Sequence, residues 1–241
     1  MNAIFRHELH GYFTTPVGYI FLMMYTALAG IVYVFINIAQ EMSASMNLLL
    51  SGMQLPFMLI APLLTMRLFA EERRTRTDQL LLTSPVRVWQ IVLGKLAAAC
   101  AMLALSMGLT LFYPLVIRSW AQVSVAQIAT VWLGYYLLGV SMLSIGALIS
   151  AMCEHQVSAA VLTLGINVFL YLSEHYILPQ TASAALRHAR SLLIWLPSAA
   201  RLGDFANGII SLADCVYFIS VTALFAFLTC RSIESRRFAK G

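Results

Sequence analysis

Residues 69–95 read FAEERRTRTDQLLLTSPVRVWQIVLGK, a dense group of acidic and basic side chains set between two apolar stretches. The rest of the chain contrasts strongly with this group. Of its 241 residues, 61% are hydrophobic and only 10% are charged, whereas soluble proteins carry about 25% charged residues. With a mean hydropathy of +0.83, the chain lacks the polar surface that a soluble globule needs. The composition therefore indicates an integral membrane protein.

Six apolar stretches are candidates for membrane-crossing helices, because about 20 apolar residues span the hydrocarbon core of a bilayer. We expect an all-α, polytopic fold with one transmembrane domain over residues 1–241. Residues 1–16 are predicted to form an amphipathic interfacial helix, and the next stretch lacks a signal-peptide cleavage site, so it is predicted to be a retained anchor. The predicted spans are about Val17–Ala39, Leu55–Phe69, Val88–Ile117, Ile128–Cys153, Val157–Leu178 and Leu212–Cys230.

The distribution of lysine and arginine predicts the orientation of these spans. With the N-terminus inside, eleven of the 15 basic residues fall on inner segments, and the outer segments hold only Arg118, Arg187, Arg190 and Arg201. The positive-inside rule then places both termini and residues 70–87 in the cytoplasm. We therefore expect a multi-pass protein of the cell (inner or plasma) membrane. Cytoplasmic loops and the lipid bilayer account for the net charge of +5, so no nucleic-acid partner is expected.

Residues 179–211 form the long outer segment between the fifth and sixth spans. Within it, residues 191–210 read SLLIWLPSAARLGDFANGII, which is too apolar for a loop that lies wholly in water. Apolar runs shorter than a full span favour interfacial or re-entrant segments. Because Pro197 and Gly203 interrupt this run, we expect two short re-entrant helices in the outer leaflet.

The charged group between the second and third spans has its own helix signals. Thr77 is a candidate N-cap, and Asp78 lies in the first turn, where the helix dipole favours an acidic residue. Three leucines follow at 80–82, and the pair Ser84–Pro85 stops one helix and begins the next. Charges that simply end a span explain most such clusters. A short capped helix with an apolar centre and a mixed charged rim is also typical of a protein-docking surface.

This region resembles the signature that lies between spans two and three in the membrane subunits of type-2 ABC transporters. The matching positions are Glu71, Glu72, Thr77, Leu80, Leu81, Leu82, Thr83, Pro85, Gly94 and Lys95. Residues 5–21 resemble the amphipathic helix and first span of such subunits, and residues 214–238 resemble the last span and tail of the gliding-motility-type branch. Many members have Gly where Arg76 stands and Glu where Gln79 stands, so the choice of partner is expected to differ.

The resemblance implies a permease subunit of an ABC exporter. Such a subunit pairs with a second permease copy or a homologous permease, and with two copies of a separate ATPase that holds ATP and Mg. A coupling helix at about Thr77–Thr83 would dock in the ATPase, and Lys95 would anchor the third span at the interface. The implied coupling residues are Glu71, Glu72, Arg73, Arg74, Thr77, Leu80, Leu81, Leu82 and Pro85. An alternative is a non-transporting ABC-type complex that drives envelope remodelling or surface motility.

The chain itself carries no recognisable catalytic motif. Gly94-Lys95 lacks the upstream glycine of a P-loop and is followed by Leu96, so ATP hydrolysis and its cofactors are expected on the partner subunit. HELH at residues 7–10 spaces its histidines by three rather than the four of zinc proteases, so no metal site is expected. A membrane-embedded hydrolase would need acids or histidines clustered inside the spans. The cysteines form no C-x-x-C pair: Cys100, Cys153, Cys215 and Cys230.

Three further features lie within or beside the fourth and fifth spans. Glu154 and His155 occupy the turn between these spans and form either a second ATPase contact or a solvated turn. Asn167 lies inside the fifth span, where it either hydrogen-bonds across helices or lines a conduit. Small residues recur over positions 139–147 and predict close helix packing.

Overall fold

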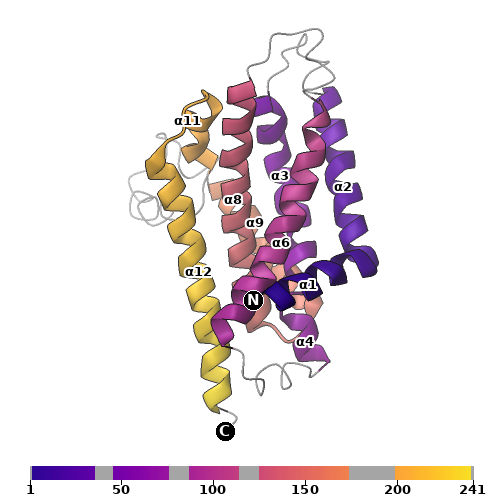
Figure 1. Cartoon of the computed structure of the whole chain (residues 1–241). Helices are drawn as coiled ribbons and strands as arrows, with labels where there is room; N and C mark the ends of the chain where they lie inside the picture. The colour runs from indigo at the N-terminus through magenta and orange to yellow at the C-terminus, as the bar shows by residue number, and fades with distance from the viewer. Residues whose placement is uncertain (1, 36–45, 76–86, 114–124, 174–198, 240–241) are drawn as a thin grey trace.

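The computed structural model describes residues 2–35, 46–75, 87–113, 125–173 and 199–239 (Figure 1). These parts of the chain are helical and contain no β-strand, which confirms the predicted all-α class. The elements are α1 (Asn2–Thr14), α2 (Pro16–Tyr33), α3 (Met46–Thr65), α4 (Ala70–Arg74), α6 (Val88–Thr110), α8 (Val125–Met152), α9 (Gln156–Leu172), the 3₁₀ turn η4 (Ala199–Leu202), α11 (Gly203–Ala206) and α12 (Leu212–Ala239).

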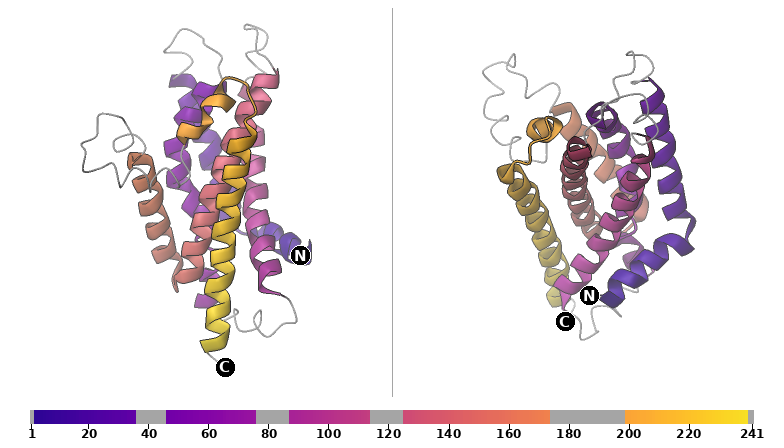
Figure 2. Two further views of the ribbon diagram at one scale, coloured as in Figure 1. Left: turned by 90° about the vertical axis from the view of Figure 1, so that its left-hand side faces the viewer. Right: turned by 45° about the horizontal axis from the view of Figure 1, so that its top comes forward.

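Helix α8 is the centre of the bundle. It packs against α3, α6, α9 and α12, and Figures 1 and 2 show it in the middle of the bundle, with α12 along one side. Two thirds of its most apolar 18-residue window is buried inside the protein, compared with 22% for α2 and for α12. The outer helices α2 and α12 therefore present most of their apolar side chains to lipid, as expected for a protein in a bilayer.

Close packing around α8 depends on its small residues, as the sequence predicted. A Cβ atom added to Gly146 would lie 2.6–2.8 Å from side-chain atoms of Thr65 on α3. A Cβ added to Gly139 would lie 2.6 Å from Leu103 on α6. Glycine at these two positions lets the neighbouring helices approach the α8 backbone more closely than any other residue would allow.

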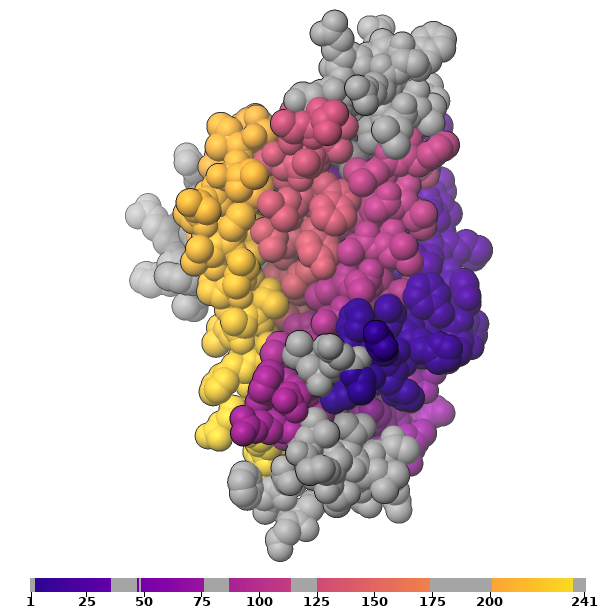
Figure 3. All heavy atoms as spheres, in the orientation of Figure 1, coloured from indigo at the N-terminus to yellow at the C-terminus, as the bar shows by residue number. Residues whose placement is uncertain are grey.

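Helix α1 lies obliquely across the bundle and turns sharply into α2. Thr15 has extended backbone angles and Pro16 begins α2, the arrangement that proline favours at a helix start. A Cβ on Gly18 would collide with the backbone carbonyl of Tyr12, so glycine allows the two helices to meet at this corner. Helix α1 then packs on α6, and Figure 3 shows it against the lower part of that helix.

The helices match most of the predicted spans. Within the described residues, five helical segments are long and apolar enough to cross a membrane: Pro16–Tyr33, Leu49–Arg74, Val88–Thr110, Val125–Met152 and Leu212–Ser235. The predicted fifth span corresponds to α9, a shorter apolar helix of 17 residues. The predicted start of the second span at Leu55 was wrong, because α3 already begins at Met46. Gln54 lies in the first turns of α3 and is buried against protein. Its polarity lowers the hydropathy there, so hydropathy did not indicate that the helix had already begun.

The described part of the segment before α12 is helical but short. Helices η4 and α11 pack against the N-terminal part of α8, where the ring of Phe205 covers Gly134. Gln127 donates a hydrogen bond to the carbonyl of Ala206 (3.2 Å). Gly208 follows in the left-handed region at φ = 83°, a conformation that favours glycine. Of the two predicted re-entrant helices, the part before residue 199 lies outside the described residues.

Candidate functional site: the charged cluster below α3

The α3 helix is interrupted at residues 66–69, and a hydroxyl from α8 fills the interruption. In a continuous helix the Ala70 N–H would bond the Met66 carbonyl. Here Ser150 Oγ accepts hydrogen bonds from the N–H groups of Phe69 and Ala70, both at 3.2 Å, and donates to the Met66 carbonyl at 3.3 Å. Insertion of a side chain into the helical ladder is a recognised cause of kinks. Ser150 therefore fixes where α3 ends and α4 begins.

A second side chain supports the same interruption from α1. The Tyr12 hydroxyl donates a hydrogen bond to the Leu64 carbonyl (2.8 Å). That carbonyl is in need of a donor, because the Leu68 N–H bonds the Thr65 carbonyl instead (3.2 Å). Burial raises the pKa of the Tyr12 phenol far above its usual range, so the hydroxyl keeps the proton that it donates.

Lys95 connects α6 to both α1 and α4. Its ammonium lies 2.6 Å from Glu8 Oε1 on α1 and 2.9 Å from Glu72 Oε1 on α4, and 5.6 Å from the centre of the Phe69 ring. The Lys95 side chain is only 2% exposed, whereas those of Glu8 and Glu72 are 20% and 22% exposed. A buried ammonium requires this kind of pairing. The expected interface anchor therefore lies inside the protein, where it joins three helices.

Glu71 and Arg73 of α4 are also bonded within the chain. Arg67 binds Glu71 with two parallel hydrogen bonds of 2.6 Å, the bidentate geometry that gives strong arginine–carboxylate pairs. Arg73 Nη1 donates to the carbonyls of Met152 (3.1 Å) and Cys153 (2.7 Å). These carbonyls end α8, where the helix dipole favours a cation. We call Glu8, Arg67, Glu71, Glu72, Arg73, Lys95 and Glu154 the base cluster.

The structure brings several of the sequence-predicted site residues into this cluster. Glu71, Glu72, Arg73 and Lys95 all take part, and Glu154 reaches Arg73 Nη2 at 3.4 Å from the α8–α9 turn. Two others are exposed: Arg74 at the end of α4 and His155 at the N-cap of α9. The remaining candidates lie outside the described residues: Thr77, Leu80, Leu81, Leu82 and Pro85.

Several residues of the site were not predicted from the sequence, namely Tyr12, Arg67 and Ser150, together with the pairing role of Glu8. Lys95 is separated from Glu8 by 87 positions, so local patterns cannot pair them. The available signal was chemical: a lone lysine inside an apolar stretch requires a partner. His7 and His10 are exposed while Glu8 is directed to Lys95. Among the described residues, no three His, Cys, Asp or Glu side chains gather as metal ligands.

The base cluster is suited to holding helices together rather than to chemistry on a substrate. Its cations are matched by carboxylates or helix-terminal carbonyls, and the cleft beside it, of about 190 Å³, lies between α1 and the end of α3. Residues lining this cleft include Glu8, Tyr12, Arg67 and Glu71. Through these contacts α4 is bonded directly to α6 and α8, and Lys95 links it to α1. The short charged helix is therefore attached to three helices of the bundle.

Comparison with known proteins identifies the family. The sequence model of the ABC-2 family transporter proteins matches residues 37–229, which cover most of the chain and the α3–α4–α6 region. A comparison with curated proteins gives no match. Membrane subunits of this family are typically non-catalytic permeases that work with an ABC ATPase. The chain, with its multiple apolar helices and the signature residues of its charged stretch, therefore belongs to the ABC-2 family of transporter proteins and is a membrane permease subunit.

Proposed function

We propose that this permease subunit exports its substrate and is driven by two copies of a separate ATPase that dock on the coupling helix expected at about Thr77–Thr83. In this proposal the ATPases hold ATP and Mg, and two permease chains, identical or homologous, form the membrane part. The observation that supports the proposal is the attachment of α4, which ends at Arg74, shortly before that segment. A displacement of that segment would be passed through Lys95 and Arg73 to α1, α6 and α8.

The proposed orientation places α4 and both termini in the cytoplasm. Helix α4, the N-terminal part of α1 and the C-terminal end of α12 lie toward the same end of the bundle (Figure 1). Basic side chains are abundant at that end, which supports the inward orientation. The orientation can be tested with single added cysteines and a membrane-impermeant maleimide. Thr75→Cys should react only in inside-out vesicles and Ile209→Cys only in right-side-out vesicles, with the unmodified chain giving the background. The reverse pattern would exclude docking of an ATPase at residues 76–86.

Docking is tested by co-purification of the permease with its cognate ATPase. Leu81→Asp places a charge among the predicted apolar contacts, so we expect loss of the ATPase from the complex and loss of permease-dependent ATP turnover. Gln79→Glu is the matched control, because it adds a negative charge two residues away without changing a leucine. Many members of the family carry Glu there, so this variant should keep the ATPase bound. Normal assembly and turnover with Leu81→Asp would refute the proposed docking segment.

A further inference from the structure

Pro62 creates a vacancy in the hydrogen-bond ladder of α3. Proline has no N–H, so the Met58 carbonyl, four residues earlier, loses its normal helical donor. Asn167 on α9 supplies a replacement: its Nδ2 lies 3.3 Å from the Met58 oxygen. Because a carbonyl oxygen must be met by an N–H, this contact also fixes which way the amide is oriented. The sequence left two roles open for Asn167, and this bond between helices corresponds to the first.

The environment of Asn167 indicates that its bond to Met58 is its main interaction. The side chain is fully buried, and its Oδ1 atom has no hydrogen-bond partner. One turn earlier, the Thr163 hydroxyl is also buried and unpartnered. Burying a half-satisfied amide in an apolar interior is costly. An apolar residue of similar size would avoid that cost but would leave the Met58 carbonyl bare.

Three carbonyls of α3 and of the interruption that follows it accept hydrogen bonds from side chains of other helices. Those of Met58, Leu64 and Met66 accept hydrogen bonds from side chains on α9, α1 and α8 respectively. The helix is therefore weakened at successive points, and each point is closed by a different neighbour. Such breaks are the places where a helix can change its angle.

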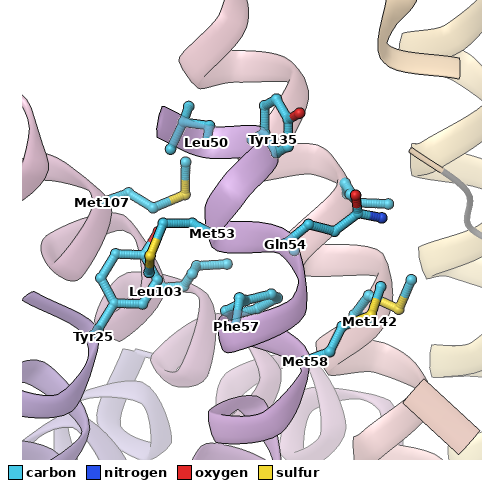
Figure 4. Close-up of a pocket in the computed structure, with 12 residues that line it drawn as sticks. Tyr25, Leu50, Met53, Gln54, Phe57, Met58, Leu103, Met107, Tyr135 and Met142 are labelled. Atoms are coloured by element: carbon cyan, nitrogen blue, oxygen red, sulfur yellow. The ribbon is translucent and has the colours of Figure 1, made fainter. Parts of the chain in front are cut away.

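The packing around Met58 allows such a change. A small cavity of about 20 Å³ lies between α2, α3, α6 and α8, and Figure 4 shows its lining. Four methionines contribute to that lining: Met53, Met58, Met107 and Met142. Methionine is unbranched and flexible, and it refills irregular space at low cost. The contact surface of α3 can therefore be repacked without opening a large void.

We propose that Asn167 is a positioning residue for coupling. By bonding the carbonyl freed by Pro62, it stabilises the turn of α3 that proline weakens, and so helps to fix where α4 and the base cluster lie. The bond itself is a property of this chain alone, whereas its part in coupling rests on the proposed function.

A double-mutant cycle tests the bond in the isolated permease. Asn167→Leu removes the amide at nearly constant volume and should lower the apparent Tm by several degrees. Pro62→Ala restores an N–H at position 62, so in that background Asn167→Leu should cost much less. Thr163→Val is the matched control, since it removes a buried hydroxyl that has no partner, and it should leave Tm unchanged or raised. Equal costs of Asn167→Leu in both backgrounds would overturn the proposal.

Hydrogen exchange locates the effect and separates it from general loss of stability. Asn167→Leu should speed amide exchange in residues 59–75 and leave residues 216–230 on α12 unchanged, with Pro62→Ala reversing the increase. In the assembled complex, trapping the ATPase with ATP and vanadate should alter exchange in α9 of the wild type and of Thr163→Val. That response should be lost in Asn167→Leu, and its persistence would refute the role in coupling. If Leu81→Asp leaves the complex with the ATPase intact, the proposed function fails. The Asn167/Pro62 double-mutant cycle in the isolated permease still tests whether Asn167 stabilises α3 at Pro62.

Discussion

Replacement of Lys95 by methionine is the sharpest test of the base cluster. The substitution keeps most of the apolar stem and removes the ammonium that lies 2.6 Å from Glu8 and 2.9 Å from Glu72. At an effective dielectric constant of about 20, each contact represents roughly 6 kcal/mol of attraction before the cost of desolvation is subtracted. Loss of one partner of a buried ion pair typically costs about 3–5 kcal/mol.

The expected cost for Lys95→Met is somewhat smaller than that range. Glu8 and Glu72 are each about one fifth exposed, so water screens the two carboxylates once the lysine is gone. We expect a loss of about 2–4 kcal/mol, within the usual range for mutations that strand buried charges. For a chain of this size, 1 kcal/mol lowers Tm by about 2–4 °C. The predicted fall in apparent Tm is therefore roughly 5–15 °C.

The assay is thermal unfolding in detergent, followed by tryptophan fluorescence, on a cycle of variants. Glu72→Gln in the Lys95→Met background removes one of the two stranded carboxylates and should recover part of the lost Tm. Arg231→Met is the control, because its pair with Glu234 is 3.8 Å long and largely exposed, and exposed pairs contribute about 0–1 kcal/mol. The reasoning would be refuted if Lys95→Met lowered Tm no more than Arg231→Met does. It would also be refuted if the Tm changes of Lys95→Met and Glu72→Gln simply added in the double variant.

Three further substitutions test the contacts around the end of α3 by the same assay. Tyr12→Phe leaves the Leu64 carbonyl without its donor and should cost about 1–3 kcal/mol, as for other buried groups left unsatisfied. Ser150→Ala deprives three backbone groups of their partner and should cost at least as much, because each is a buried polar group. Gly146→Val forces side-chain atoms into Thr65 and should cost about 1–3 kcal/mol through overpacking of α3 against α8.

Each of these substitutions has a matched control elsewhere in the chain. Tyr19→Phe changes an exposed tyrosine on α2, and Ser144→Ala removes only a bond to the Ser141 carbonyl of its own helix. Gly165→Ala adds a Cβ that has no atom within 4 Å. We expect little loss of Tm from all three. If these controls lowered Tm as much as their counterparts, the contacts at the end of α3 would contribute no more to stability than ordinary sites do.

The sequence predicted the helix boundaries that depend only on neighbouring residues. Apolar length indicated the start of α6 at Val88 and the start of α12 at Leu212, and the structure has both. The expectation that Ser84–Pro85 begins α6 was wrong, because Arg87 has extended backbone angles and forms the N-cap of α6. The start of α3 was missed for a physical reason. Hydropathy measures transfer into lipid, whereas the first turns of α3 pack against protein, where Gln54 is buried. Polar residues can lie inside a bundle without marking the end of a span.

The base cluster could be predicted only in part. The charges of α4 are adjacent in sequence, so their common location followed directly from the pattern. The contacts between helices around them did not, because Lys95 binds Glu8 across 87 positions and the Ala70 N–H binds Ser150 across 80 positions. Helix crossing angles and the corner at Thr15–Pro16 decide which side chains meet, and a single sequence does not give those angles. A lysine inside an apolar stretch indicated that a partner exists, without indicating which one.

The contacts of α4 also change how the charged stretch should be understood. Glu71, Glu72 and Arg73 each have partners within the chain, so they hold α4 in place, and the proposed contact with the ATPase falls to the residues after Thr75. Under the proposed function, docking and transmission would then be separate tasks of adjacent segments. Docking needs an apolar surface that a partner can cover, whereas transmission needs a stiff connection that does not yield under load. Short ion pairs between helices resist sliding, so a dense mixture of charges suits transmission. This role would account for the concentration of charges beside one short helix in an otherwise hydrophobic chain.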